Sequence, residues 1–304
     1  MPRFIVLFLA LMLAAPAWAA SPRDSLLVTP AWLAAHQHDP GLVLLHVGDK
    51  KAYDRKHIPG ARLVDLDDIS NSSMAAGGLM LEMPTPEDLR TRLARLGVSD
   101  NSRIVVYYGQ DWISPATRVV FTLDAAGLGD HTVLLDGGMG AWTREGHAVT
   151  DKATPTVTGK LSPLKMKDEV VDAAFVQSHL GKPGYVVVDG RSAAFYDGVQ
   201  TGGGSGMALH KTGHIAGARS IPFTSVTGAD LKFLPADRLA AVFQRAGVKS
   251  GDTVVGYCHI GQQATAMLFA ARTLGLKVLL YDGAFEDWSH RNLPVENPSR
   301  RSAR

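Results

Sequence analysis

One cysteine, Cys258, is the residue of this 304-residue chain best suited to covalent chemistry. The residues before it, Thr253–Tyr257, have the composition of a buried parallel strand, and Ala264–Leu274 has that of a helix. Cys258 therefore begins a short loop, Cys258–Gln263, between a strand end and a helix start. Backbone N–H groups and the positive end of a helix dipole both favour the reactive thiolate in such a loop. The alternative is an inert thiol packed in the core.

The beginning of the chain predicts export. Arg3 supplies a positive charge, residues 4–15 form an apolar run, and Ala17-Trp18-Ala19 has the small-x-small form of a cleavage site. We therefore expect residues 1–19 to be a signal peptide and the protein to be periplasmic or secreted. The apolar run is too short to span a bilayer comfortably, so no stable membrane anchor is expected after cleavage. A single thiol cannot form an internal disulfide, so in an oxidising compartment it is either reactive or an intermolecular partner.

The composition is that of an ordinary globular protein, with 46% hydrophobic residues and a net charge of +2. This balance gives no reason to expect nucleic acid as a partner. The 11 histidines are scattered along the chain, so we predict neither a metal site nor a cofactor. The mature length exceeds what one core usually organises, which favours two domains.

An internal repeat makes that organisation specific. Residues 57–62 (HIPGAR) match 214–219 (HIAGAR), and residues 134–137 (LLDG) match 280–283 (LYDG). Short apolar runs, among them 185–189 and 277–281 as expected strands, alternate with helix-length segments. This alternation predicts an α/β fold with a helix-flanked parallel sheet in each half. We expect domains at 24–150 and 164–297, with the Thr- and Pro-containing segment 151–163 as the linker. Aligning residues 103–108 with 252–257 puts Gly109 at the position of Cys258, so the chemistry is expected in the second half.

These motifs together resemble the rhodanese family of thiosulfate and 3-mercaptopyruvate sulfurtransferases. The motifs that carry the resemblance are the strand end 188–191 (VDGR), the turn 213–218 (GHIAGA), the loop Tyr257-Cys258-x-x-Gly261, and the segment 282–288 (DGAFEDW). The likeness is to tandem members with an inactive first domain and a catalytic second domain. It implies that Cys258 takes sulfur from a small anionic donor as a persulfide and passes it to a thiophilic acceptor.

We expect a substrate-binding set around Cys258, made up of Arg191, His259, Gly261, Gln262 and Gln263. The resemblance implies the role of Arg191, whereas His259, Gln262 and Gln263 depart from the best-known patterns of the family. Arg191 ends its strand near the loop and by resemblance would bind the anionic donor, so Arg191→Ala should weaken donor use more than the fold. The alternative is a surface ion pair with Asp189 or a neighbour. A charged His259 would lower the thiol pKa and attract an anion; the alternative is an exposed loop histidine. Gly261 would supply a backbone conformation or a close approach.

Three further points bear on function. His259 and Ile260 follow the cysteine. Thiosulfate-preferring relatives place two cations there and mercaptopyruvate-preferring relatives place Gly and Ser, so the identity of the sulfur donor stays undecided. His214 is assigned to a structural turn, because the first half keeps a histidine there without a nucleophile. The segment Gly198–Thr212 has no counterpart in the first half, and its composition fits a mobile flap or, as we favour, a surface insertion.

Two other function classes compete with sulfur transfer. A phosphatase or arsenate reductase also surrounds an anion with a cysteine loop, but the phosphate-clamping arginine six positions on is replaced by Ala264, and there is no second cysteine. A sulfur carrier, redox sensor or binding protein on the same scaffold is the non-enzymatic alternative.

Overall fold

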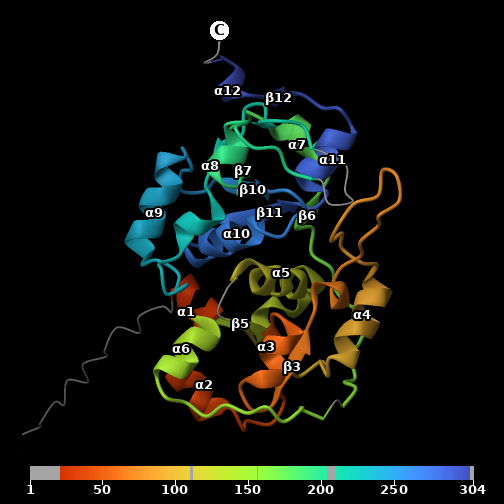
Figure 1. The fold of residues 1–304 in the computed structure, drawn as a ribbon, viewed down its shortest axis with the longest axis vertical. Helices are drawn as coiled ribbons and strands as arrows, with labels where there is room; N and C mark the ends of the chain where they lie inside the picture. The colour runs from red at the N-terminus through yellow and green to blue at the C-terminus, as the bar shows by residue number, and fades with distance from the viewer. Residues whose placement is uncertain (1–20, 110–111, 156, 204–209, 302–304) are drawn as a thin grey trace, which may run out of the picture.

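The computed structural model describes residues 21–109, 112–155, 157–203 and 210–301. The expected signal peptide at 1–19 lies outside the described residues. The described chain forms two similar α/β lobes, one above the other (Figure 1). Within the described ranges, no helix is both long enough and apolar enough to cross a membrane.

The first lobe contains a five-stranded sheet in the order β1-β5-β4-β2-β3, and its neighbouring strands all pair in parallel. Its strands are β1 (Leu27–Val28), β2 (Leu42–Val47), β3 (Ala61–Val64), β4 (Arg103–Tyr108) and β5 (Thr132–Leu135). Its α-helices are α1 (Pro22–Leu26), α2 (Pro30–His36), α3 (Lys50–Arg55), α4 (Pro86–Arg95), α5 (Ser114–Leu123) and α6 (Gly138–Arg144).

The second lobe repeats the arrangement with the order β6-β11-β10-β7-β9, again all parallel. Its strands are β6 (Val170–Val171), β7 (Tyr185–Asp189), β9 (Arg219–Ser220), β10 (Thr253–Tyr257) and β11 (Lys277–Tyr281), with a small antiparallel pair of β8 (His214–Ile215) and β12 (Val295–Glu296). Its α-helices are α7 (Ala173–His179), α8 (Ala193–Tyr196), α9 (Ala236–Arg245), α10 (Ala264–Thr273), α11 (Ala284–His290) and α12 (Pro298–Arg301).

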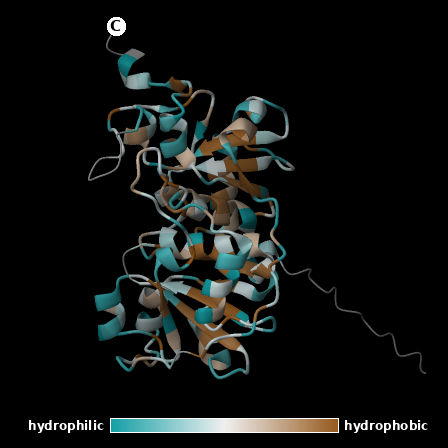
Figure 2. Ribbon diagram, turned by 90° about the vertical axis from the view of Figure 1, so that its right-hand side faces the viewer, coloured by the Kyte–Doolittle hydropathy of each residue, from teal (hydrophilic) through white to brown (hydrophobic). Residues whose placement is uncertain are grey.

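The strands are mostly apolar in both lobes (Figure 2), as expected for parallel sheets covered by helices. The predicted α/β fold with two similar sheets is therefore confirmed. The strands that we expected at 185–189 and 277–281 have the predicted bounds, and the helix expected at 264–274 is α10.

The two lobes meet along α5 and α10, which lie side by side at the centre of the molecule (Figure 1). The hydroxyl groups of Thr117 on α5 and Thr265 on α10 lie 2.9 Å apart in a hydrogen bond. Apolar side chains from both lobes belong to one buried cluster, for example Val119 of α5 and Met267 of α10. This shared core makes the interface between the lobes part of the folded structure rather than a loose contact.

The strand register corrects one detail of the sequence repeat. In β4, Tyr107 pairs with His46 of β2, and in β10, Tyr257 pairs with Asp189 of β7. The hydroxyl of Tyr107 accepts from the Ile58 N–H, and that of Tyr257 accepts from the matching Ile215 N–H. Tyr107 is therefore the structural counterpart of Tyr257.

It follows that Tyr108, rather than Gly109, stands where the second lobe has Cys258. The sequence alignment was wrong by one residue, because two adjacent tyrosines end β4 and only one precedes the cysteine. The Tyr108 hydroxyl donates to the Leu231 carbonyl and accepts from the Gly137 N–H. A buried phenol thus takes the place of the cysteine in the first lobe.

Candidate active site

Cys258 lies directly after β10, the strand between β7 and β11 in the second sheet. The carboxyl ends of parallel strands gather binding and catalytic loops, so this is the expected edge for chemistry. The chain then turns through residues 258–263 before α10 begins at Ala264. The start of α11 holds the turn, because the N–H groups of Phe285 and Glu286 donate to the carbonyls of Cys258 and His259, each at 3.0 Å.

The environment of the Cys258 sulfur contains two opposing effects. Burial raises the thiol pKa above its ordinary value of 9.0, since the side chain is 0% exposed. The backbone N–H groups of Ala264, Ile260 and Gln263 hydrogen-bond to the sulfur and lower the pKa, but they do not outweigh burial. The sequence predicted an N–H cradle that favours the thiolate. The cradle is present, but the prediction that the thiol pKa is lowered is wrong, because burial outweighs the cradle.

His259 differs from its sequence-based prediction. Burial, followed by the positive charges of Arg191 and His210, lowers the pKa of His259 to about 3. The ring is therefore neutral at physiological pH, and the expected imidazolium beside the thiol is absent. Its Nδ1 atom has no hydrogen-bond partner among the described residues. His259 packs edge-on against Phe195, with ring centroids 4.5 Å apart, instead of extending into solvent.

Arg191 is buried and forms an ion pair with Asp189. Its Nε and Nη2 atoms donate to the two carboxylate oxygens at 2.6–3.1 Å, and Nη2 also donates to the Gly213 carbonyl at 2.7 Å. Burial lowers the Arg191 pKa, yet the Asp189 charge outweighs it and holds the pKa above its usual range. The guanidinium carbon lies 3.9 Å from the centre of the Phe285 ring. Arg191 therefore pairs with Asp189 as the alternative had it, but the pair is buried and not on the surface.

The remaining predicted loop residues have distinct positions. Gly261 adopts a left-handed φ of +78°, and a Cβ there would lie 2.8 Å from the Asp282 carbonyl oxygen. Both anticipated reasons for a glycine, conformation and close approach, therefore apply. The Gln262 amide donates to the Ser114 hydroxyl of the first lobe at 3.2 Å. Gln263 precedes α10 and directs its N–H toward the sulfur.

The histidine that recurs in both halves of the repeat supports a turn. His214 bonds through Nδ1 to the Tyr196 carbonyl at 2.7 Å, and its ring stacks on that of Tyr196. His57 makes the same bond and the same stack with Tyr53 in the lobe that has no cysteine. The predicted turn role of His214 is confirmed by this equivalence.

Comparison with known proteins now identifies the fold. Residues 29–145 and 172–291 each match the rhodanese-like domain. The chain belongs to the rhodanese family. This rhodanese is 30% identical over 277 residues to a thiosulfate sulfurtransferase of Pseudomonas aeruginosa, covering 89% of this chain and 97% of that one. It is 28% identical over 278 residues to a 3-mercaptopyruvate sulfurtransferase of Escherichia coli, covering 87% and 95%.

Solved structures share the architecture of this rhodanese. EanB in complex with ergothioneine superposes with a TM-score of 0.81 at 21% identity, covering 92% of this chain and 71% of that one. YnjE has a TM-score of 0.79 at 24% identity, covering 92% and 70%. At these identities the likeness establishes the fold alone.

The described ends of the insertion 198–212 pack beside the cysteine loop of this rhodanese. The His210 N–H donates to the Gly202 carbonyl at 3.0 Å, and the His210 ring centroid lies 5.6 Å from that of His259. Burial and the charges of Arg191 and His290 lower the His210 pKa to about 4, so this imidazole is also neutral near pH 7. The ends are therefore built into the site, which differs from the surface insertion that we favoured.

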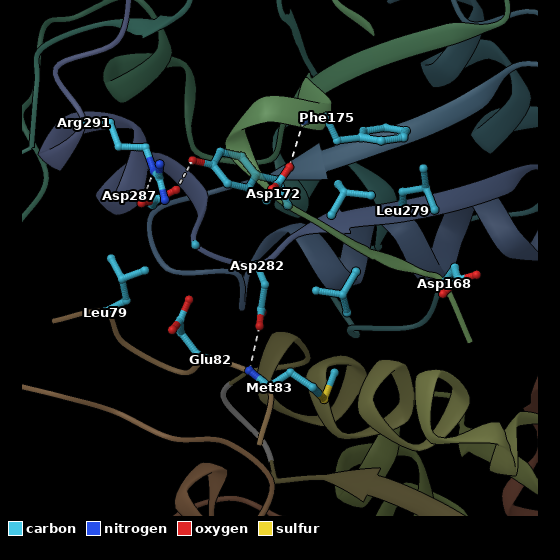
Figure 3. A pocket seen from close by; sticks show the side chains of 14 residues that line it. Leu79, Glu82, Met83, Asp168, Asp172, Phe175, Leu279, Asp282, Asp287 and Arg291 are labelled. Carbon is cyan, nitrogen blue, oxygen red and sulfur yellow. Dashed lines mark hydrogen bonds and ion pairs between the residues drawn. The ribbon is translucent and has the colours of Figure 1, made fainter. Parts of the chain in front are cut away.

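A separate cavity of about 650 Å³ lies between the lobes, and Cys258 is not among its lining residues (Figure 3). Its wall includes Glu82 and Met83 of the first lobe and Asp282 of the second. Burial and the neighbouring carboxylates, Asp282 first among them, raise the Glu82 pKa. The Asp282 carboxylate accepts from the Met83 N–H at 2.7 Å, which ties the two lobes together at the cavity edge.

Proposed function

We propose that this rhodanese is a sulfurtransferase in which Cys258 carries the transferred sulfur as a persulfide. Sulfur would come from a small anionic donor, thiosulfate or 3-mercaptopyruvate, and go to a thiophilic acceptor. Support comes from family membership and from relatives named for both donors. The observation that carries the proposal is the cysteine loop itself, in which the N–H groups of Ile260, Gln263 and Ala264 converge on the Cys258 sulfur.

The chemistry follows from a thiolate inside a ring of N–H donors. The Cys258 thiolate attacks the outer sulfur of thiosulfate, the S–S bond breaks, and sulfite leaves with the electron pair. The resulting persulfide anion is stabilised by the same N–H groups, because their dipoles already point at the sulfur position. An acceptor such as cyanide then attacks the outer sulfur, forms thiocyanate, and returns the Cys258 thiolate. No second cysteine is needed for this cycle.

Thiocyanate formation tests the proposal. The purified chain is mixed with cyanide and either thiosulfate or 3-mercaptopyruvate, and the rates with the two donors are compared. Cys258→Ser should lose activity while keeping the circular dichroism spectrum and melting temperature of the parent. Equal activity of the parent and Cys258→Ser would refute the mechanism.

A second candidate is a sulfur carrier, sensor or binding protein that does not turn over. The complete burial of Cys258 and the raised thiol pKa favour it, since both slow attack on a donor. Single-turnover measurements separate the two functions: a carrier takes up one sulfur per chain and releases it slowly, whereas an enzyme releases thiocyanate repeatedly.

We further propose that the mature protein is periplasmic or secreted and works on small molecules without nucleic acid or a stable membrane anchor. The apolar N-terminal run and the Ala17-Trp18-Ala19 site support this placement. Fractionation of the expressing cells, with mass measurement of the mature N-terminus, tests it. A full-length chain in the cytoplasmic fraction would overturn it.

A further inference from the structure

Arg118 of α5 reaches from the first lobe to the cysteine loop of the second. Its side chain is 0% exposed. Nη1 donates to the Gly261 carbonyl at 3.1 Å and to the Asp282 carboxylate at 2.6 Å. Nη2 donates to the Leu81 carbonyl of its own lobe. A planar guanidinium with several donors can bind these acceptors together, which a single ammonium cannot do.

The loop is shaped to receive this arginine. Gly261 has φ +78°, and a Cβ built there would lie 2.9 Å from Nη1 of Arg118 and 2.8 Å from the Asp282 carbonyl oxygen. A side chain at position 261 would therefore displace the guanidinium or the turn that follows β11. The glycine and the arginine from the other lobe form one arrangement.

The contact is one-sided, although the lobes are related by the repeat. The hydrogen-bonded pair of Thr117 and Thr265 marks equivalent positions on α5 and α10, so the residue matching Arg118 is Ala266. The second lobe therefore has no arginine at the matching position, although Arg272 of α10 pairs with Asp124 of the first lobe at 2.8 Å elsewhere on the interface. The first lobe has no cysteine loop to hold, because Tyr108 occupies that position and is bonded to Leu231 and Gly137. The Arg118 contact is thus made to the lobe that carries the cysteine.

Gly261 sits between the donors that surround the sulfur. The N–H groups of Ile260 on one side and of Gln263 and Ala264 on the other bond to Cys258. The Gly261 carbonyl shares its peptide plane with the next N–H in the turn, so the orientation of this carbonyl fixes how the turn is wound. Releasing the carbonyl would let the turn rewind and misdirect donors on both sides.

We propose that Arg118 is a positioning residue for sulfur transfer: the lobe without a nucleophile holds the Gly261 carbonyl and thereby keeps the N–H cradle of the other lobe aimed at Cys258. The proposal rests on the proposed function only in taking Cys258 as the nucleophile. It gives the first lobe a role in the chemistry beyond shared packing.

The test compares variants of Arg118 with a variant of Arg23, another arginine of the first lobe that contacts the second lobe. Arg118→Lys keeps a positive charge opposite Asp282 but lacks the fork of donors, and Arg118→Met removes both. Arg23→Met is the matched control, since Arg23 donates to the Phe233 and Leu234 carbonyls at 3.1 and 3.0 Å and pairs with Asp136, away from Cys258. Circular dichroism and melting establish that each variant is folded.

Two readouts are measured on the full chain: the pH profile of Cys258 alkylation by iodoacetamide, and the rate of sulfur gain from thiosulfate. Both Arg118 variants should shift the alkylation profile to higher pH and slow sulfur gain by about a hundredfold, as expected when reacting groups are displaced by about an ångström. Arg23→Met should leave both readouts at the parent values.

A folded Arg118→Lys with the parent's profile and rate would overturn the proposal, and so would equal shifts from Arg118→Lys and Arg23→Met. Failure of the proposed function has a different signature. The parent itself would then gain no sulfur, while the alkylation profile would still shift in the Arg118 variants alone.

Discussion

Replacing Arg191 by alanine should unfold this rhodanese more readily as well as impair donor use. From the sequence alone, this change was expected to weaken donor use more than the fold. The structure reverses that expectation, because Arg191 is only 1% exposed and both oxygens of Asp189 depend on it. Its removal leaves a buried carboxylate without a counter-charge and the Gly213 carbonyl without its donor.

The magnitude follows from the type of contact. Removing one partner of a buried ion pair costs about 3–5 kcal/mol, because the remaining charge is left desolvated and unpaired. A buried carbonyl left without its donor adds about 1–3 kcal/mol unless water reaches it. We therefore expect Arg191→Ala to lower the free energy of unfolding by at least about 3 kcal/mol.

The assay is urea unfolding followed by circular dichroism, comparing midpoints at unchanged slope. The chain offers its own control, since the first lobe has His46 and Gly48 where the second has Asp189 and Arg191. The double variant Asp189→His with Arg191→Gly should recover most of the lost stability, because no unpaired charge remains, and should still be inactive if Arg191 serves the donor. An Arg191→Ala protein within about 1 kcal/mol of the parent would refute this reasoning.

Two further predictions concern pH. Burial raises the Cys258 pKa above the ordinary value of a thiol, so the rate of alkylation should rise about tenfold per pH unit from neutral pH into the alkaline range without levelling; a plateau close to neutral pH would show that the N–H cradle outweighs burial. Burial, aided by the His57 charge, lowers the His46 pKa from 6.5 to about 4. The unfolded chain therefore binds this proton first, and stability falls by about 3 kcal/mol as pH drops from 6.5 to 4. His46→Phe, which keeps a ring between Tyr53 and Tyr107, should lose that part of the decline in urea unfolding at pH 6.5 and 4; parent-like pH dependence would contradict it.

Much of the fold was predictable because the two halves of the chain share the same sequence motifs in the same order. The apolar runs at 185–189 and 277–281 became β7 and β11 with the same bounds, since buried parallel strands need no polar alternation. The position of Cys258 between β10 and α10 followed from the same pattern. The one-residue error at Gly109 arose because the paired tyrosines of β4 can be aligned in two ways by sequence, and only strand pairing distinguishes them.

The electrostatics of the site could not be read from neighbouring residues in the sequence. The sequence left His259 as either a charged neighbour of the thiol or an exposed loop histidine. Neither holds, because segments distant in the chain, including His210 and Phe195, cover it and its pKa is lowered. Arg118 gave no signal as a loop contact, because an arginine on a predicted helix usually faces water. Burial created by tertiary packing decides both cases.

The measurement that tests the central claim most directly is the intact mass of the protein after incubation with thiosulfate or with 3-mercaptopyruvate, followed by cyanide. A persulfide mechanism predicts a gain of one sulfur that maps to Cys258, followed by its loss together with release of thiocyanate. A folded protein with a free thiol and no gain of sulfur from either donor would contradict the account and point to a sensor or binding role.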